Sequence, residues 1–184
     1  MSIQRCVSFC NEELTNHDLI LCEAYIEGAI AEIIVGTCNS TLVDPSNGVE
    51  VLAEIAAGRA KLIRNVRVEI PLAAPALNDS PVGGGSQIAS TYDRTITIFD
   101  ANSTAANVIF WNNVKRLRAG YIIVKEYGAN RITFIDPRNG VGIKFTGSRV
   151  IPGVKTEFQR FELIGAWSQY DESAILPAPA GVFS

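Results

Sequence analysis

The chain has 184 residues, a length typical of one domain whose core needs no disulfide or metal to hold it together. Its net charge of -3 argues against the strongly basic surface with which proteins wrap nucleic acid. No apolar run is long enough to span a membrane, and MSIQRCVSFCNEEL lacks the features of a secretory signal. We therefore expect a protein of the cell interior, or of a particle assembled there.

The first 37 residues divide into two parts. Residues 1–17 show no periodicity and are expected to form an N-terminal arm. The following segment, Asp18–Thr37, is apolar, rich in isoleucine and interrupted by two glycines. These features favour one long strand or two shorter strands over a helix.

Four cysteines lie in the first quarter of the chain, at Cys6, Cys10, Cys22 and Cys38. A structural zinc site usually takes its ligands from two close pairs, and only Cys6 and Cys10 are close. A disulfide is disfavoured by assembly in a reducing cell interior. We expect four free thiols and no bound metal, with zinc and a disulfide as the weaker alternatives.

Residues 38–72 predict a loop, a short helix and a strand. Asp44 and Pro45 suit a helix cap and a first-turn proline, and Gly58 suits the helix end. The apolar face of this helix is expected to hold Val51, Leu52 and Ile55. The strand is expected from Ala60 to Leu72, where apolar residues alternate with Arg67 and Glu69.

The segment Ala73–Ser90 is rich in proline, glycine and polar residues and predicts a long loop. Loops of this length in a compact domain are usually functional or disordered. Gly83-Gly84-Gly85 lacks the spacing and the Gly-Lys-Ser/Thr of a phosphate-binding loop. The loop is either a flexible connection or an arm that orders against a neighbouring subunit. Its candidate interface residues are Asn78, Pro81, Gly83, Gly84, Gly85 and Gln87.

The segment with the clearest secondary-structure pattern, Thr91–Pro137, predicts a strand, a helix, a strand, a turn and a strand. The helix is expected from Ser103 to Arg118, with Ser103 or Asn102 as its cap and Gly120 closing it. Apolar residues at helical spacing are expected to face the sheet. The candidate core residues are Val108, Trp111, Val114 and Leu117 of this helix, and Trp167 of a later strand.

The last third of the chain predicts further strands and an extended tail. A turn at Asp136–Gly140 precedes two short strand-like pieces and one long strand, Val154–Trp167. The single domain is thus expected to cover 18–170, and its prolines should keep the tail, 171–184, extended. Because the tail ends on apolar residues, its candidate interface residues are Pro177, Pro179, Val182 and Phe183.

Nothing in the sequence predicts an active site. His17 is the only histidine and lies in the arm, outside any catalytic triad. Asp93, Asp100 and Asp136 lie near strand ends, but a helix start and a turn explain the last two. We expect no enzyme, no cofactor and no metal. The predicted fold is mainly β (α+β): a β-sandwich or barrel-like sheet with one principal flanking helix and a short second helix.

Residues Tyr92–Trp167 carry a resemblance to a known class, through the strings RTITIFDANS, IFWNNV, GYIIVKEYG, ITFID, RVIP and EFQRFELIGAW. This region resembles virion structural proteins of tailed phages that infect Bacteroidetes-type hosts, and is most similar to the tail-tube class. The resemblance implies a β-sandwich flanked by a helix, assembled as stacked hexameric rings. It also implies a sheet between subunits that lines a lumen, with loops and termini contacting adjacent rings.

The resulting hypothesis is a structural subunit of a phage particle, a tail-tube or ring protein that assembles with itself into a conduit for DNA. Its expected partners are copies of itself and other virion proteins. DNA would pass without sequence-specific binding, and no membrane is involved. A conduit also explains the missing basic patch, because strong phosphate neutralisation would hold the DNA in place. The alternatives are a capsid-decorating or head-tail joining virion protein, and a non-viral ligand-binding β-domain or enzyme.

Overall fold

The computed structural model describes residues 30–72, 74–79, 87–125, 130–138, 140–153, 159–169, 171 and 173–183. The predicted arm at 1–17 therefore lies outside the described residues. The helices are α1 (Gly48–Ala56) and α2 (Ala105–Leu117). The strands are β1 (Ile30–Gly36), β2 (Ala60–Glu69), β3 (Ala74–Asp79), β4 (Gln87–Asp100), β5 (Tyr121–Lys125), β6 (Arg131–Ile135), β7 (Lys144–Val150), β8 (Arg160–Gln169) and β9 (Ala174–Pro177).

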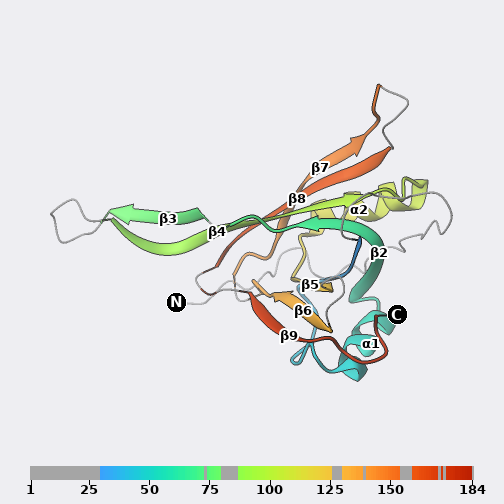
Figure 1. The fold of residues 1–184 in the computed structure, drawn as a ribbon, viewed down its shortest axis with the longest axis horizontal. Coiled ribbons are helices and arrows are strands. Elements are labelled where there is room, and N and C mark those ends of the chain that lie inside the picture. Colours follow the sequence, from blue (N-terminus) through green and yellow to red (C-terminus); the bar gives the residue numbers. More distant parts are fainter. Residues whose placement is uncertain are drawn as a thin grey trace.

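The strands form one antiparallel sheet in the order β7-β8-β4-β2-β1-β5-β6-β9, and β3 pairs with β4 off this path (Figure 1). Ala119 and Ile143, which precede β5 and β7, exchange two backbone hydrogen bonds of 3.0 and 2.7 Å. This bridge draws the β7 side of the sheet toward β5, so the sheet curls. The fold is mainly β with flanking helices, and the predicted fold class is confirmed.

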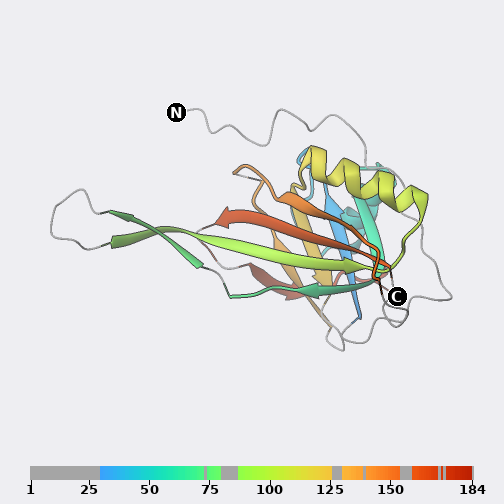
Figure 2. The ribbon, with the colours of Figure 1, turned by 90° about the horizontal axis from the view of Figure 1, so that it is seen from above.

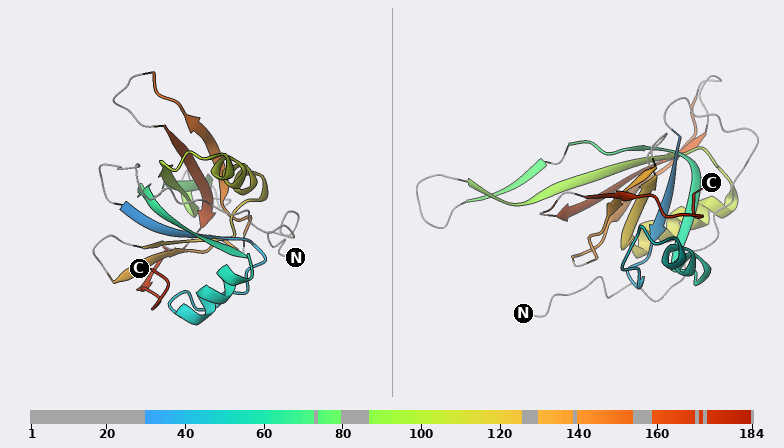
Figure 3. Two further views of the ribbon diagram at one scale, coloured as in Figure 1. Left: turned by 90° about the vertical axis from the view of Figure 1, so that its right-hand side faces the viewer. Right: turned by 60° about the horizontal axis from the view of Figure 1, so that its bottom comes forward.

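The two faces of the sheet bury two separate hydrophobic clusters. In β1, Ile33 and Val35 point into one cluster and Ile34 points into the other, as expected of a strand covered on both faces. Helix α2 covers the first cluster and α1 covers the second. The left view of Figure 3 shows the two helices on opposite sides of the sheet.

Helix α2 lies where the sequence predicts it, with different ends. Its cap is Thr104, whose hydroxyl accepts from Asn107 N at 3.2 Å, so the prediction of Ser103 or Asn102 is wrong by one or two positions. Its end is Arg118, at a φ of 62°. Gly120 does not close the helix. A Cβ there would lie 2.4 Å from the carbonyl oxygen of Thr37, so glycine is needed for close approach between chain segments.

Helix α1 also starts later than predicted. Asn47 is its cap and accepts from Val49 N, whereas Asp44 accepts from Ser46 N in the preceding turn. Val51 is buried, but Leu52 is 46% exposed, which corrects its placement on the buried face.

The predicted loop at 73–90 is largely a β-hairpin. Strand β3 pairs with the first half of β4, from Ala74 opposite Asp93 to Asp79 opposite Gln87. The expectation of a structureless loop is therefore wrong for 74–79 and 87–90. The proline, glycine and polar residues of this segment are typical of loops, so the sequence does not reveal the strands.

The remaining strand predictions hold in outline. The two short pieces predicted at 141–153 are one strand, β7, and the long strand predicted from Val154 is β8, which begins at Arg160. Trp167 lies in the first cluster and is 6% exposed. The tail contributes β9, which pairs with β6 at the edge of the sheet.

Candidate functional site

The β3–β4 ribbon, formed by Ala74–Asp79 and Gln87–Asp93, projects from the sheet (Figure 1). Strand β8 pairs with β4 only from Tyr92 onward, and no other described strand pairs with β3. Figures 1 and 2 show the ribbon extending well beyond the other strands. A two-stranded ribbon alone is marginally stable in water, and its free edges are templates for another strand.

The ribbon contains two of the candidate interface residues predicted from the loop. Asn78 pairs with Ile88, and Gln87 pairs with Asp79, so both lie in the strands of the ribbon. Pro81, Gly83, Gly84 and Gly85 lie outside the described residues.

The two outer strands of the main sheet, β7 and β9, are poor templates for pairing with a strand of another molecule. In β7, Gly147 has a φ of 115°, and its carbonyl accepts a hydrogen bond from Lys115 of α2 at 3.2 Å. Strand β9 has four residues and ends at Pro177, which has no N–H to donate. Irregular backbone, lysine and proline all blunt a sheet edge. Strand β3 is itself six residues long, includes Pro75 and has a register shift after Ala76, so what distinguishes the ribbon is its extension beyond the sheet (Figure 1) and not the regularity of its edge.

The outer face of β7, β8, β4 and β2 is uncovered and balanced in charge. Its cross-strand rows include Ser148–Glu162–Phe99–Arg67 and Thr146–Ile164–Thr97–Glu69. Arg67 pairs with Glu69, and Arg160 lies 3.7 Å from Glu162. Arg67 and Arg160 also lie 5.5 and 6.0 Å from the ring centroid of Phe99. The face is therefore polar without a net basic character.

The two helices expose outer faces of different chemistry. On α1, Val49, Leu52, Ala53 and Ala56 are exposed at helical spacing, so its outer face is apolar. On α2, Ala105, Ile109, Asn112 and Arg116 are exposed. Helix α1 contains no lysine or arginine, and α2 contains no aspartate or glutamate.

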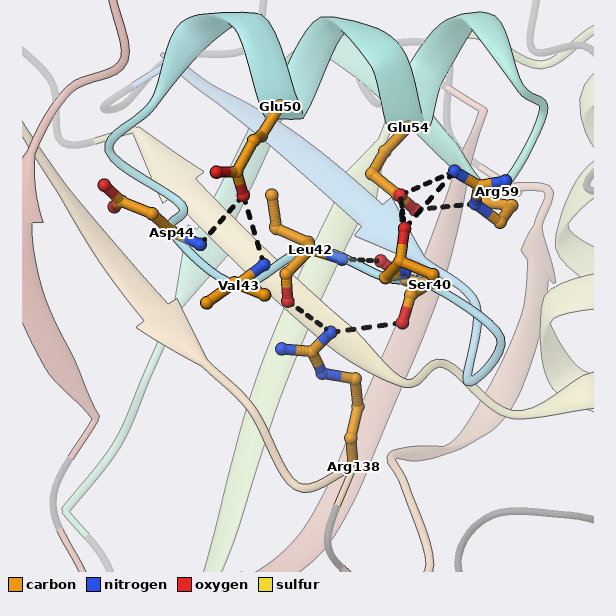
Figure 4. Close-up of polar contacts among 9 residues, drawn as sticks. Ser40, Leu42, Val43, Asp44, Glu50, Glu54, Arg59 and Arg138 are labelled. Carbon is orange, nitrogen blue, oxygen red and sulfur yellow. Dashed lines mark hydrogen bonds and ion pairs between the residues drawn. The ribbon is translucent and has the colours of Figure 1, made fainter.

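A polar network holds the loop before α1 in place (Figure 4). Glu54 is 2% exposed and accepts from Arg59 at 2.8 and 3.0 Å and from the Thr41 hydroxyl at 2.7 Å. Burial raises the pKa of Glu54, but hydrogen bonds from Arg59, Thr41 and Ser40 outweigh it and hold the pKa at about 2.

On its opposite side, the same loop is held by hydrogen bonds from Arg138. Its guanidinium donates to the carbonyl of Leu42 at 2.8 Å and to the carboxylate of Asp136 at 2.6 and 2.7 Å. The guanidinium also lies 5.2 Å from the ring centroid of Tyr121, and burial raises the pKa of that phenol to about 12. Glu54 and Arg138 thus hold the loop from two sides through hydrogen bonds to Thr41 and to Leu42.

The three predicted aspartates are separate. Asp93 accepts from the Ser168 hydroxyl at 2.6 Å, and Asp136 binds Arg138. Asp100 is fully buried and accepts from Trp111 Nε1 at 2.7 Å. No group of metal-ligating side chains occurs within the described residues.

The C-terminal residues are not the free apolar end that the sequence predicts. Val182 is 4% exposed and lies in the second cluster, with Phe183 packed against it. Pro179 is buried and Pro177 is exposed. The tail folds back over α1, where a Cβ at Gly48 would lie 2.1 Å from Ala180 O. The second cluster thus covers the apolar end within the same chain.

The prediction of four free thiols is wrong for Cys38, which is disulfide-bonded. The other three cysteines, Cys6, Cys10 and Cys22, lie outside the described residues. The prediction rested on the expected redox compartment, whereas pairing depends on which segments the fold brings together, and this is invisible in cysteine spacing.

Comparison with known protein families, with characterised proteins and with solved structures finds no match to this chain. No helix in the described ranges has the length and apolarity to cross a membrane.

Sequence reasoning missed the polar network and the outer face of α1. Arg138 and Leu42 are far apart in sequence, and no local pattern predicts their contact. The apolar outer face of α1 could have been predicted from the sequence, because Val49, Ala53 and Ala56 are apolar at helical spacing on the side opposite Val51. Helix α1 therefore has apolar residues on its outer face as well as on its buried face, in addition to Glu50 and Glu54.

Proposed function

We propose that this protein is a structural subunit of a phage particle, a tail-tube or ring protein that assembles with copies of itself into a conduit for DNA. The observation that carries the proposal is the β3–β4 ribbon, which extends beyond the sheet with free edges. In an isolated subunit such a ribbon is marginal, whereas in an assembly it gains strand partners.

The charge distribution agrees with a conduit. The uncovered sheet face pairs Arg67 with Glu69 and places Arg160 beside Glu162, so it offers no basic track for phosphates. DNA that must slide through a channel is best served by a polar lining with little net charge.

The experiment removes the outer part of the ribbon, residues 78–87, and joins the ends with a short glycine-serine turn. The shortened protein should melt cooperatively as a monomer and fail to form rings or tubes in electron micrographs. A matched control replaces Val141, which is 67% exposed and lies outside the ribbon, with threonine. The control should assemble. Normal assembly of the shortened protein would reject the ribbon as the interface.

A capsid-decorating or head-tail joining role is the second candidate. The width of the lumen separates the two roles, because a conduit needs an opening that admits duplex DNA.

A further inference from the structure

The outer faces of α1 and α2 are complementary, and one molecule cannot bring them together. Helix α1 presents Val49 at 78%, Leu52 at 46% and nearby Val43 at 84% exposure. Helix α2 presents Ile109 at 55% exposure. The helices cover opposite faces of the same sheet, so any contact between their outer faces must join two molecules (Figure 3).

The charges at the helix ends also match. Asp44 and Glu50 lie at the N-terminal end of α1, and hydrogen bonds from Ser46 lower the pKa of Asp44, which keeps it ionised. Lys115 and Arg116 lie in the last turn of α2, followed by Arg118. These charges suit their own helix dipoles, and an antiparallel contact would also place the acidic end beside the basic end.

We propose that α1 of one copy docks antiparallel against α2 of the next copy. The inference rests on the proposed function, because it names a second interface of the same assembly. A contact between unlike surfaces on opposite sides of a molecule is heterologous, so it repeats from copy to copy and builds a closed ring or an open stack.

The area that the α1–α2 contact can bury decides whether this contact could hold the assembly together by itself. Helix α1 has nine residues and is therefore about 13.5 Å long, too short to bury the roughly 1,200 Å² of a stable interface alone. The helix contact therefore adds to the contacts of the ribbon. Breaking it should weaken assembly without abolishing the fold of the subunit.

The test is a charge exchange across the proposed contact. Leu52→Glu and Ile109→Glu each place a carboxylate on an exposed position, and each should raise the concentration needed for assembly by about tenfold or more. The pair Leu52→Glu with Ile109→Lys should recover most of the loss, because the new charges attract. The control is Ile151→Glu, at a position 65% exposed and outside both helices, which should assemble like the wild type.

Light scattering over a concentration series measures assembly, and thermal melting checks that each variant is folded. Single variants that assemble like the wild type, or a pair whose losses add without recovery, would overturn the helix contact and leave the ribbon proposal standing. A wild-type protein that stays monomeric would overturn both proposals.

Discussion

Trp111 is a single residue whose contacts contribute to the stability of the folded protein. The indole is fully buried in the first cluster, lies 4.9 Å from Phe110 between ring centroids, and donates to Asp100. Trp111→Ala should lower the free energy of unfolding by about 3 to 5 kcal/mol, the cost of removing a large buried aromatic side chain. Urea denaturation measures this, with Asn112→Ala on the exposed side of the same helix as control.

The smaller change Trp111→Phe keeps most of the packing and removes the indole donor to Asp100. It should cost about 1 to 3 kcal/mol, the range for a buried polar group that loses a partner. A monomer whose stability is unaffected by Trp111→Ala would contradict the core assignment and point to a subunit contact.

Glu54 makes the stability of the folded protein depend on pH. Its pKa in the folded protein is about 2, below the ordinary value of 4.5, so the folded state holds the ionised form. Its contribution to stability is fully present above about pH 4.5 and is lost as the pH falls toward 2. Glu54→Gln should cost about 2 kcal/mol at neutral pH, between the values for exposed and buried ion pairs.

Unfolding of the wild type and of Glu54→Gln at neutral and acidic pH tests this assignment. The stability difference between them should shrink as the pH approaches 2. A difference that stays constant with pH would show that the ionised carboxylate is not what holds the loop.

At the scale of elements, the C-terminal tail acts as part of the fold. Val182 inserts into the second cluster beside α1, so Val182→Ala should destabilise the folded protein by about 1 to 2 kcal/mol. Thermal melting of the variant measures the loss. If Val182→Ala melts like the wild type and fails to assemble, the tail would again be an interface, as the sequence predicted.

The elements that could be predicted are those whose signal is local. The α2 helix shows its buried stripe through Val108, Trp111 and Val114, and Thr91–Asp100 shows the alternation of a strand. Most of the ribbon lacks such a signal, because residues 73–90 are rich in the proline, glycine and polar residues that are typical of a loop. The burial of Val182 and the support of Leu42 by Arg138 depend on contacts between distant segments, which one sequence does not display.

At the scale of the whole molecule, the features that are hard to explain in a monomer are the ribbon and the exposed apolar residues of α1. Both are covered if the subunit repeats around an axis, with the ribbon adding strands to a neighbour and the helices docking in series. The other candidate features are satisfied within the chain, including the buried network around Glu54 and the apolar tail.

Electron microscopy of the purified full-length protein tests the central claim most directly. We expect rings or tubes of one defined symmetry, with an open lumen wide enough for duplex DNA, roughly 20 Å across on the scale of the two grooves. Particles that remain monomeric at high concentration, with the melting temperature independent of concentration, would contradict it.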